Sequence, residues 1–137
     1  MTNIRNRSCS VILTFLLMGS QHIVLGKVNV VITNKLGNGR TMNIHCRSRD
    51  DDLGHHSVAD GSKIFWKFSV NFWGTTLFYC NVKWDDSKWH GFIAYSYERD
   101  SDRCERECIW KISADGLLYK YNEVTAEWEF MPFQDGQ

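Results

Sequence analysis

The sequence predicts an all-β fold, a small antiparallel β-sandwich of seven or eight strands stapled by two disulfides. Aromatic residues make up 14% of the 137 residues while proline occurs once, a composition that favours packed strands over helical bundles or proline-rich linkers. Apolar and polar residues alternate along several short runs, and turn-forming residues separate these runs at intervals of about ten positions. No window carries a helical apolar stripe longer than two turns, so we expect no substantial helix.

The expected strands begin with an alternating run in which Val28, Val30 and Ile32 share one face. A turn over 36–39 ends this run, because its glycine and asparagine residues tolerate the positive φ of tight reversals. Asp115-Gly116 is a strong hairpin signal between two later runs. The expected strands cover residues 28–33, 41–47, 63–70, 75–84, 92–97, 108–113, 117–121 and 126–131.

Residues 1–26 have the features of a secretory signal peptide. Two arginines precede the apolar run 11–18, and small residues lead to a predicted cleavage site before Lys27. The apolar run is shorter than the roughly 20 residues that span a bilayer, so we expect no stable membrane insertion. A buried N-terminal helix or a short membrane anchor is the alternative. We therefore expect a secreted, extracellular protein with a single domain over residues 27–137.

Four cysteines remain after the predicted cleavage, and an even number in a short secreted chain indicates a disulfide framework. Four cysteines permit three pairings, and the sequence leaves all three open. We favour a pairing that avoids the very tight loop between the last two cysteines. The favoured disulfides are Cys46–Cys108 and Cys80–Cys104.

Charge and motifs exclude several classes of function. The mature chain keeps 14 basic and 16 acidic residues, so it lacks the positive field with which proteins gather nucleic acid. No Gly-x-Ser-x-Gly elbow is present, and cysteines held in disulfides cannot act as nucleophiles. We therefore expect no catalytic residues, no cofactor and no enzymatic activity. No Asn-x-Ser/Thr sequon lies in the mature chain, so we also expect no N-glycan.

An acidic run precedes Gly54 and consists of Asp50, Asp51 and Asp52. Calcium loops place their ligands at alternate positions, so this run is expected to be a solvated turn rather than a metal site. The nearby histidines His45, His55 and His56 and Cys46 match no familiar zinc spacing. We expect no metal centre.

A run of alternating charge over 98–107 is the first candidate for partner binding, because loops on a rigid scaffold often carry specificity. The alternative is an exposed, merely soluble connection. Four tryptophans invite a second reading as a sugar-stacking platform, although we expect most of them to fill the core. The candidate contact residues are Glu98, Arg99, Asp100, Asp102 and Arg103, followed by Asp50, Asp51 and Asp52; the tryptophans are Trp73, Trp84, Trp89 and Trp128.

Several segments together resemble the plant self-incompatibility S-protein homologue family. The segment 45–54 is similar to its hallmark of His-Cys, a basic-Ser-basic step and Asp-Asp-Leu-Gly, with Arg47 and Arg49 where lysine is more usual. The segment 75–80, followed by Trp84, is similar to the family's central Thr-x-Phe-x-Cys segment. The segments 102–104, 108–110 and 115–116 resemble its second cysteine pair and its late hairpin, so the resemblance extends over residues 28–132.

The resemblance implies a small secreted plant protein with a disulfide-stapled β-sandwich. It further implies a non-enzymatic signalling or recognition ligand that binds a cell-surface receptor through its loops, since one member acts in the pistil to reject self pollen. A secreted carbohydrate-binding, lectin-like module is the alternative function.

Overall fold

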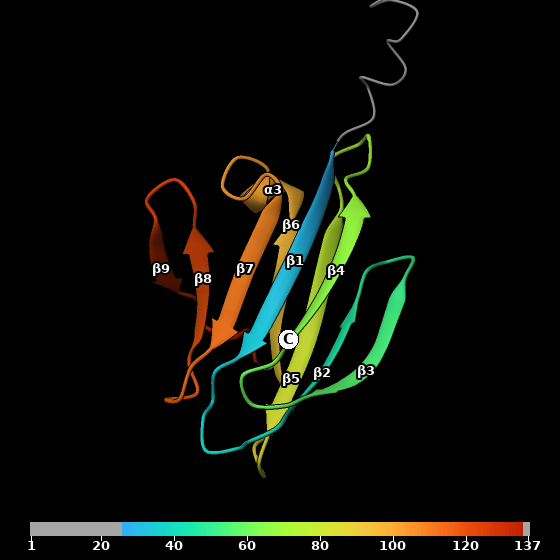
Figure 1. Ribbon diagram of the computed structural model, residues 1–137. Helices are drawn as coiled ribbons and strands as arrows, with labels where there is room; N and C mark the ends of the chain where they lie inside the picture. Colours follow the sequence, from blue (N-terminus) through green and yellow to red (C-terminus); the bar gives the residue numbers. More distant parts are fainter. Residues whose placement is uncertain (1–25, 136–137) are drawn as a thin grey trace, which may run out of the picture.

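The computed structural model describes residues 26–135, which form nine strands and one short helix in two facing sheets (Figure 1). All but the last residue of the predicted signal peptide, 1–26, lies outside the described residues. No helix in the described part of the chain has the length and apolar character needed to cross a membrane. The elements are β1 (Lys27–Asn34), β2 (Met42–Arg47), β3 (Asp52–Val58), β4 (Lys63–Ser69), β5 (Leu77–Trp84), β6 (His90–Ser96), α3 (Tyr97–Asp100), β7 (Glu107–Ile112), β8 (Leu118–Asn122) and β9 (Glu127–Phe130).

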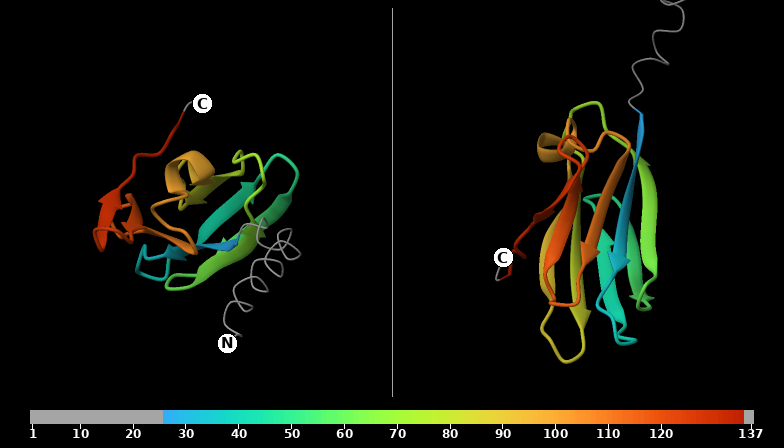
Figure 2. Two further views of the ribbon diagram at one scale, coloured as in Figure 1. Left: turned by 90° about the horizontal axis from the view of Figure 1, so that it is seen from above. Right: turned by 60° about the vertical axis from the view of Figure 1, so that its left-hand side comes forward.

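The two sheets confirm the predicted sandwich (Figure 2). One sheet has the strand order β4-β1-β7-β8-β9, and the other has the order β3-β2-β5-β6. Neighbouring strands are antiparallel except for β1 and β7, which run parallel in the middle of the larger sheet. This parallel pair is the one departure from the antiparallel arrangement expected from the sequence.

The strand β3 was not expected, because the sequence predicts a turn over residues 48–54. The turn occupies only residues 48–51, and pairing with β2 starts at Asp52, opposite Arg47. Both faces of most of β3 are partly or fully exposed, as befits an edge strand. The strand therefore lacks the alternation of apolar and polar residues that marks a half-buried strand.

Alternating residues of both sheets fill the space between them. Val30 and Ile32 of β1, Ile44 of β2 and Trp110 of β7 are almost completely buried. The indole Nε1 of Trp110 donates a hydrogen bond of 2.9 Å to the carbonyl oxygen of Ala94 on the opposite sheet. This bond satisfies the polar edge of a large buried ring and joins the two layers.

The two disulfides are Cys46–Cys80 and Cys104–Cys108, so the pairing favoured from sequence is wrong. Cys46 and Cys80 lie directly opposite each other on β2 and β5, with their Cα atoms 4.0 Å apart. Cys104 and Cys108 approach within 5.1 Å because the chain turns back after α3 before it enters β7. The local loop is therefore tight but sterically allowed.

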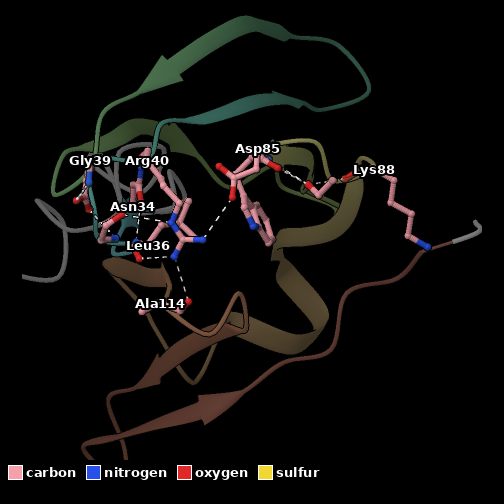
Figure 3. Close-up of polar contacts among 11 residues, drawn as sticks. Asn34, Leu36, Gly39, Arg40, Asp85, Lys88 and Ala114 are labelled. Carbon is pink, nitrogen blue, oxygen red and sulfur yellow. Dashed lines mark hydrogen bonds and ion pairs between the residues drawn. The ribbon is translucent and has the colours of Figure 1, made fainter.

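One end of the sandwich is tied together by Arg40, which follows the turn after β1 (Figure 3). Its guanidinium donates hydrogen bonds to the carbonyl oxygens of Leu36 at 2.6 Å and Ala114 at 3.2 Å, and it pairs with Asp85 at 3.4 Å. The side-chain amide of Asn34 donates to the carbonyl oxygens of Arg40 and Val58. Four connections between strands are fixed to one another at this end.

Candidate partner-binding surface

Both loops predicted to contact a partner lie at the other end of the sandwich (Figure 1). The turn 48–51 follows the end of β2, and α3 follows the end of β6. The strand β5 starts between these two ends, with Arg47 opposite Tyr79 and Ser96 opposite Leu77. The loop 70–76, which leads into β5, therefore lies between the two predicted contact segments.

Asp100 does not fit the predicted role of a contact residue, because its side chain is completely buried. The carboxylate accepts hydrogen bonds from the backbone N–H of Ser96 and from the guanidinium of Arg99, and Lys120 Nζ lies 3.3 Å away. Burial lowers the pKa of Lys120, and the carboxylate of Asp100 opposes that effect. Asp100 is thus the centre of a buried ion-paired group that fixes the segment.

The environment of Asp100 also excludes one arrangement of metal ligands. Its carboxylate and the sulfur atoms of Cys104 and Cys108 lie within 4.8 Å of one another. Both sulfur atoms are bonded in the disulfide, and two cations already neutralise the carboxylate. Disulfide sulfur is not the thiolate that metal ions bind. The same argument applies to Cys46, whose sulfur is bonded to that of Cys80.

Arg99 is held by the protein as well. Its Nη2 atom donates a hydrogen bond of 2.9 Å to the carbonyl oxygen of Ile93, and its guanidinium lies 5.3 Å from the centre of the Trp110 ring. Of the five residues predicted in this segment, three have exposed side chains that remain available to a partner: Glu98, Asp102 and Arg103.

The acidic run forms a rigid turn at the end of β2. Ser48 and Asp51 are joined by two hydrogen bonds, from the N–H of Ser48 to the carbonyl oxygen of Asp51 and from the N–H of Asp51 to the Ser48 hydroxyl. Asp52 accepts hydrogen bonds from the N–H of Gly54 and from His45 Nε2, and these contacts lower the pKa of Asp52. All three aspartates are exposed, and Asp52 differs from Asp50 and Asp51 in that its carboxylate is held by these hydrogen bonds.

A hollow of about 450 Å³ lies between the acidic turn and the loop that precedes β5. Arginine and aspartate side chains line one wall, and threonine, asparagine and aromatic side chains line the other. The wall residues with the most distinctive chemistry are Arg47, Arg49, Asp50, Asp51, Phe68 and Tyr79. The lining of the hollow therefore combines both signs of charge with aromatic rings.

The loop 70–76 carries two exposed aromatic side chains beside this hollow. Phe72 is 70% exposed and Trp73 is 79% exposed, and their ring centres lie 5.2 Å apart in an edge-to-face arrangement. The expectation that most of the four tryptophans fill the core is wrong, because Trp73, Trp89 and Trp128 are exposed and only Trp84 packs against the core. Soluble proteins rarely leave two adjacent large rings in water without a functional reason.

Local contacts hold this loop in shape. The side chain of Asn71 accepts a hydrogen bond from the N–H of Thr75 and donates one to its hydroxyl, and the N–H of Asn71 donates to the Thr76 hydroxyl. Gly74 has a φ of 71°, and a Cβ at this position would lie 2.9 Å from the Tyr97 ring. Glycine is needed here for both the left-handed backbone and the close approach to the residue that begins α3.

The sequence-based candidates for the partner-contact loops include neither Phe72 nor Trp73, and Trp73 is named there only among the four tryptophans of a possible sugar-stacking platform. The available signal was their position, because they lie in the gap between the expected strands 63–70 and 75–84. Two large rings in a predicted loop cannot both enter a core that the flanking strands already fill.

Comparison with known proteins places the chain among plant proteins of one family. A family model described as plant self-incompatibility protein S1 matches residues 29–132. The chain belongs to this family. It is 42% identical over 103 residues to self-incompatibility protein S1 of Papaver rhoeas, a match that covers 74% of this chain and 73% of that protein. It is 36% identical over 107 residues to S-protein homolog 2 of Arabidopsis thaliana, which covers 75% of this chain and 65% of the relative.

A solved structure of a self-incompatibility protein homologue (SPH) has the same fold. It matches with a TM-score of 0.57 at 19% identity, covering 80% of this chain and 91% of that chain. The SPH family is described with that structure as widespread, small, highly stable, secreted proteins from plants. The resemblance predicted from the sequence is confirmed, and this chain is a member of a family of secreted plant proteins.

Proposed function

We propose that this protein is a secreted recognition ligand of the self-incompatibility S-protein type, which binds a cell-surface receptor through the loop end of its sandwich. The contact surface consists of the loop 70–76, the turn 48–51 and the exposed side chains that follow α3. Membership of the family supports the signalling role. The proposal assigns no catalytic step to any residue.

The exposed pair Phe72 and Trp73 is the observation that carries this proposal. Buried aromatic anchors supply most of the affinity in protein interfaces, and tryptophan is prominent among them. The Asn71 hydrogen bonds and the contact of Gly74 with Tyr97 fix the loop before a partner arrives. A preformed loop loses little conformational entropy on binding, which favours tight association.

The charged side chains around the hollow have a different role in this proposal. Arg49, Asp50 and Asp51 line the hollow, and Asp102 and Arg103 are exposed in the segment that follows α3. Exposed charges at the rim of an interface mainly set the association rate and the choice of partner. These five residues are therefore expected to govern specificity, while the aromatic pair supplies affinity.

Binding to living cells tests the proposal without knowledge of the receptor. Fluorescently labelled protein should bind saturably to protoplasts from at least one tissue of the plant that makes it, and protease treatment of the cells should abolish binding. Trp73→Ala should weaken this binding by at least about tenfold, as loss of an aromatic anchor does. Trp89→Ala, which removes an exposed tryptophan at the opposite end, is the matched control and should bind like the wild type.

Equal binding of the Trp73→Ala and wild-type proteins would contradict the proposed surface. Saturable binding that survives protease treatment of the cells would contradict a protein receptor. Asp102→Lys should slow association and leave dissociation nearly unchanged, which can be followed in the same assay by time course.

The carbohydrate-binding alternative is favoured by a separate observation, the exposed rings of Phe65, Trp128 and Phe130 on strands of the larger sheet. These side chains lie on strands, whereas the receptor surface proposed above consists of loops, so the two functions are compatible.

A further inference from the structure

The outer face of the five-stranded sheet carries two rows of side chains that cross all or most of its strands. In one row, the register places Thr33 between Lys63 and Lys111, and Tyr119 between Lys111 and Phe130. The neighbouring row contains Phe65 opposite Val31, Val31 opposite Ile109, and Tyr121 opposite Trp128. Successive residues on a strand alternate between faces, so all of these side chains point away from the core.

Large rings are exposed on this face rather than covered. Phe65 is 61% exposed, Phe130 is 54% exposed and Trp128 is 41% exposed. The rings of Tyr121 and Trp128 pack edge to face at 5.3 Å, and those of Tyr119 and Phe130 do so at 6.2 Å. Cross-strand pairing holds the rings in fixed orientations.

Lysine side chains accompany the rings. The ammonium group of Lys111 lies 4.2 Å from the centre of the Trp128 ring and 5.6 Å from that of Tyr119. The outward positions of the sheet hold four lysines and one glutamate: Lys27, Lys63, Lys67, Lys111 and Glu107. The glutamate accepts a hydrogen bond from Asn29. The face is therefore positive, although the mature chain as a whole has more acidic than basic residues.

This charge decides between the possible occupants. A second copy of the chain related by a two-fold axis would bring lysines against lysines, which is unfavourable. A negatively charged partner would instead be attracted to the lysines. A stiff, extended polymer can lie across several strands of the sheet and stack its rings on the exposed aromatic side chains.

We propose that the aromatic outer face, defined by Phe65, Lys111, Tyr119, Tyr121, Trp128 and Phe130, binds an acidic polysaccharide, a polymer of uronic acid residues. The sugar rings stack on the aromatic side chains, and the uronate carboxylates pair with the lysines. This site is separate from the receptor surface at the loop end, so either can exist without the other.

Affinity electrophoresis with the protein secreted from plant cells tests this site. Native gels containing polygalacturonate should retard the protein, and gels containing fully methyl-esterified polygalacturonate should retard it much less, because esterification removes the charge. Trp128→Ala should weaken the affinity by about tenfold, the loss expected for one ring that binds by stacking and cation contact. The double variant Lys63→Gln/Lys67→Gln should reduce the dependence of binding on salt concentration.

The control variant is Trp73→Ala, which should retain full retardation because its ring lies at the loop end. Circular dichroism would establish that each variant is folded.

Equal retardation in free-acid and methyl-esterified gels would overturn the proposed role of the lysines. Unchanged retardation of Trp128→Ala would overturn the assignment to this face. Binding to vesicles that contain phosphatidylserine, with none to polygalacturonate, would overturn the polysaccharide in favour of a lipid surface. Sedimentation of a dimer that Trp128→Ala dissociates would overturn it in favour of self-association.

Discussion

Asp100 and Asp102 carry the same functional group two positions apart, but their surroundings differ. Asp100 is completely buried between Arg99 and Lys120, whereas Asp102 is exposed. Asp100→Ala should lower the free energy of unfolding by about 3–5 kcal/mol, because it leaves Lys120 buried without its counter-charge. Asp102→Ala should change it by less than about 0.5 kcal/mol. Urea unfolding of both variants measures the difference, and similar stabilities would contradict the structural role of Asp100.

The sequence could not separate these two residues. Both lie in a run of alternating charge that is typical of an exposed segment, and burial of Asp100 depends on Lys120, which lies 20 positions later on β8.

The same dependence on distant contacts explains why the sequence did not predict which tryptophans are buried. Trp110 shares the inward side of β7 with Cys108 and Ile112 and is buried, whereas Trp73 lies between strands and is exposed. The chemical type of a side chain predicts its tendency to be buried. The place of the residue in the strand topology decides whether it is buried.

At the scale of elements, strong local patterns predicted the strands well. β1 and β7 follow alternating runs, β8 follows the Asp115-Gly116 hairpin signal, and all three lie within a few residues of their predicted bounds. β3 was missed because an edge strand with two exposed faces carries no alternation, and it depends on β2 for its pairing. The favoured disulfide pairing was wrong for a related reason, since the opposition of Cys46 and Cys80 follows from the register of β2 and β5.

The two disulfides should differ in their effect on stability. Cys46–Cys80 closes a loop with a sequence separation of 34 residues, and Cys104–Cys108 closes one of 4 residues. In the chain-entropy account, their contributions are about 4 and about 2 kcal/mol respectively. The double variant Cys46→Ala/Cys80→Ala should therefore be less stable than Cys104→Ala/Cys108→Ala in urea unfolding. The reverse order would show that loop closure does not dominate the effect of these disulfides.

At the scale of the whole molecule, the sequence predicted two packed sheets but could not predict which residues lie together on each surface. The loop end unites segments around residues 50, 73 and 102 because β2, β4 and β6 all end there. The aromatic outer face unites Phe65 with Trp128 across five strands of one sheet. Both surfaces result from strand order, and strand order is set by contacts between residues that are distant in the sequence.

Cleavage before Lys27 stays a prediction from the sequence, and the mass of the secreted protein tests it. Lys27 is the first residue of β1 and lies opposite Ser69 of β4, so a chain that begins there retains all of the strands in the described residues. Intact-mass spectrometry of the protein secreted from plant cells should give the mass of residues 27–137 less four hydrogens, two for each disulfide. Reduction and alkylation should then label four cysteines, and no glycan mass should be present. A chain that retains residues before Lys27, or that is alkylated without prior reduction, would contradict this account of how the mature protein forms.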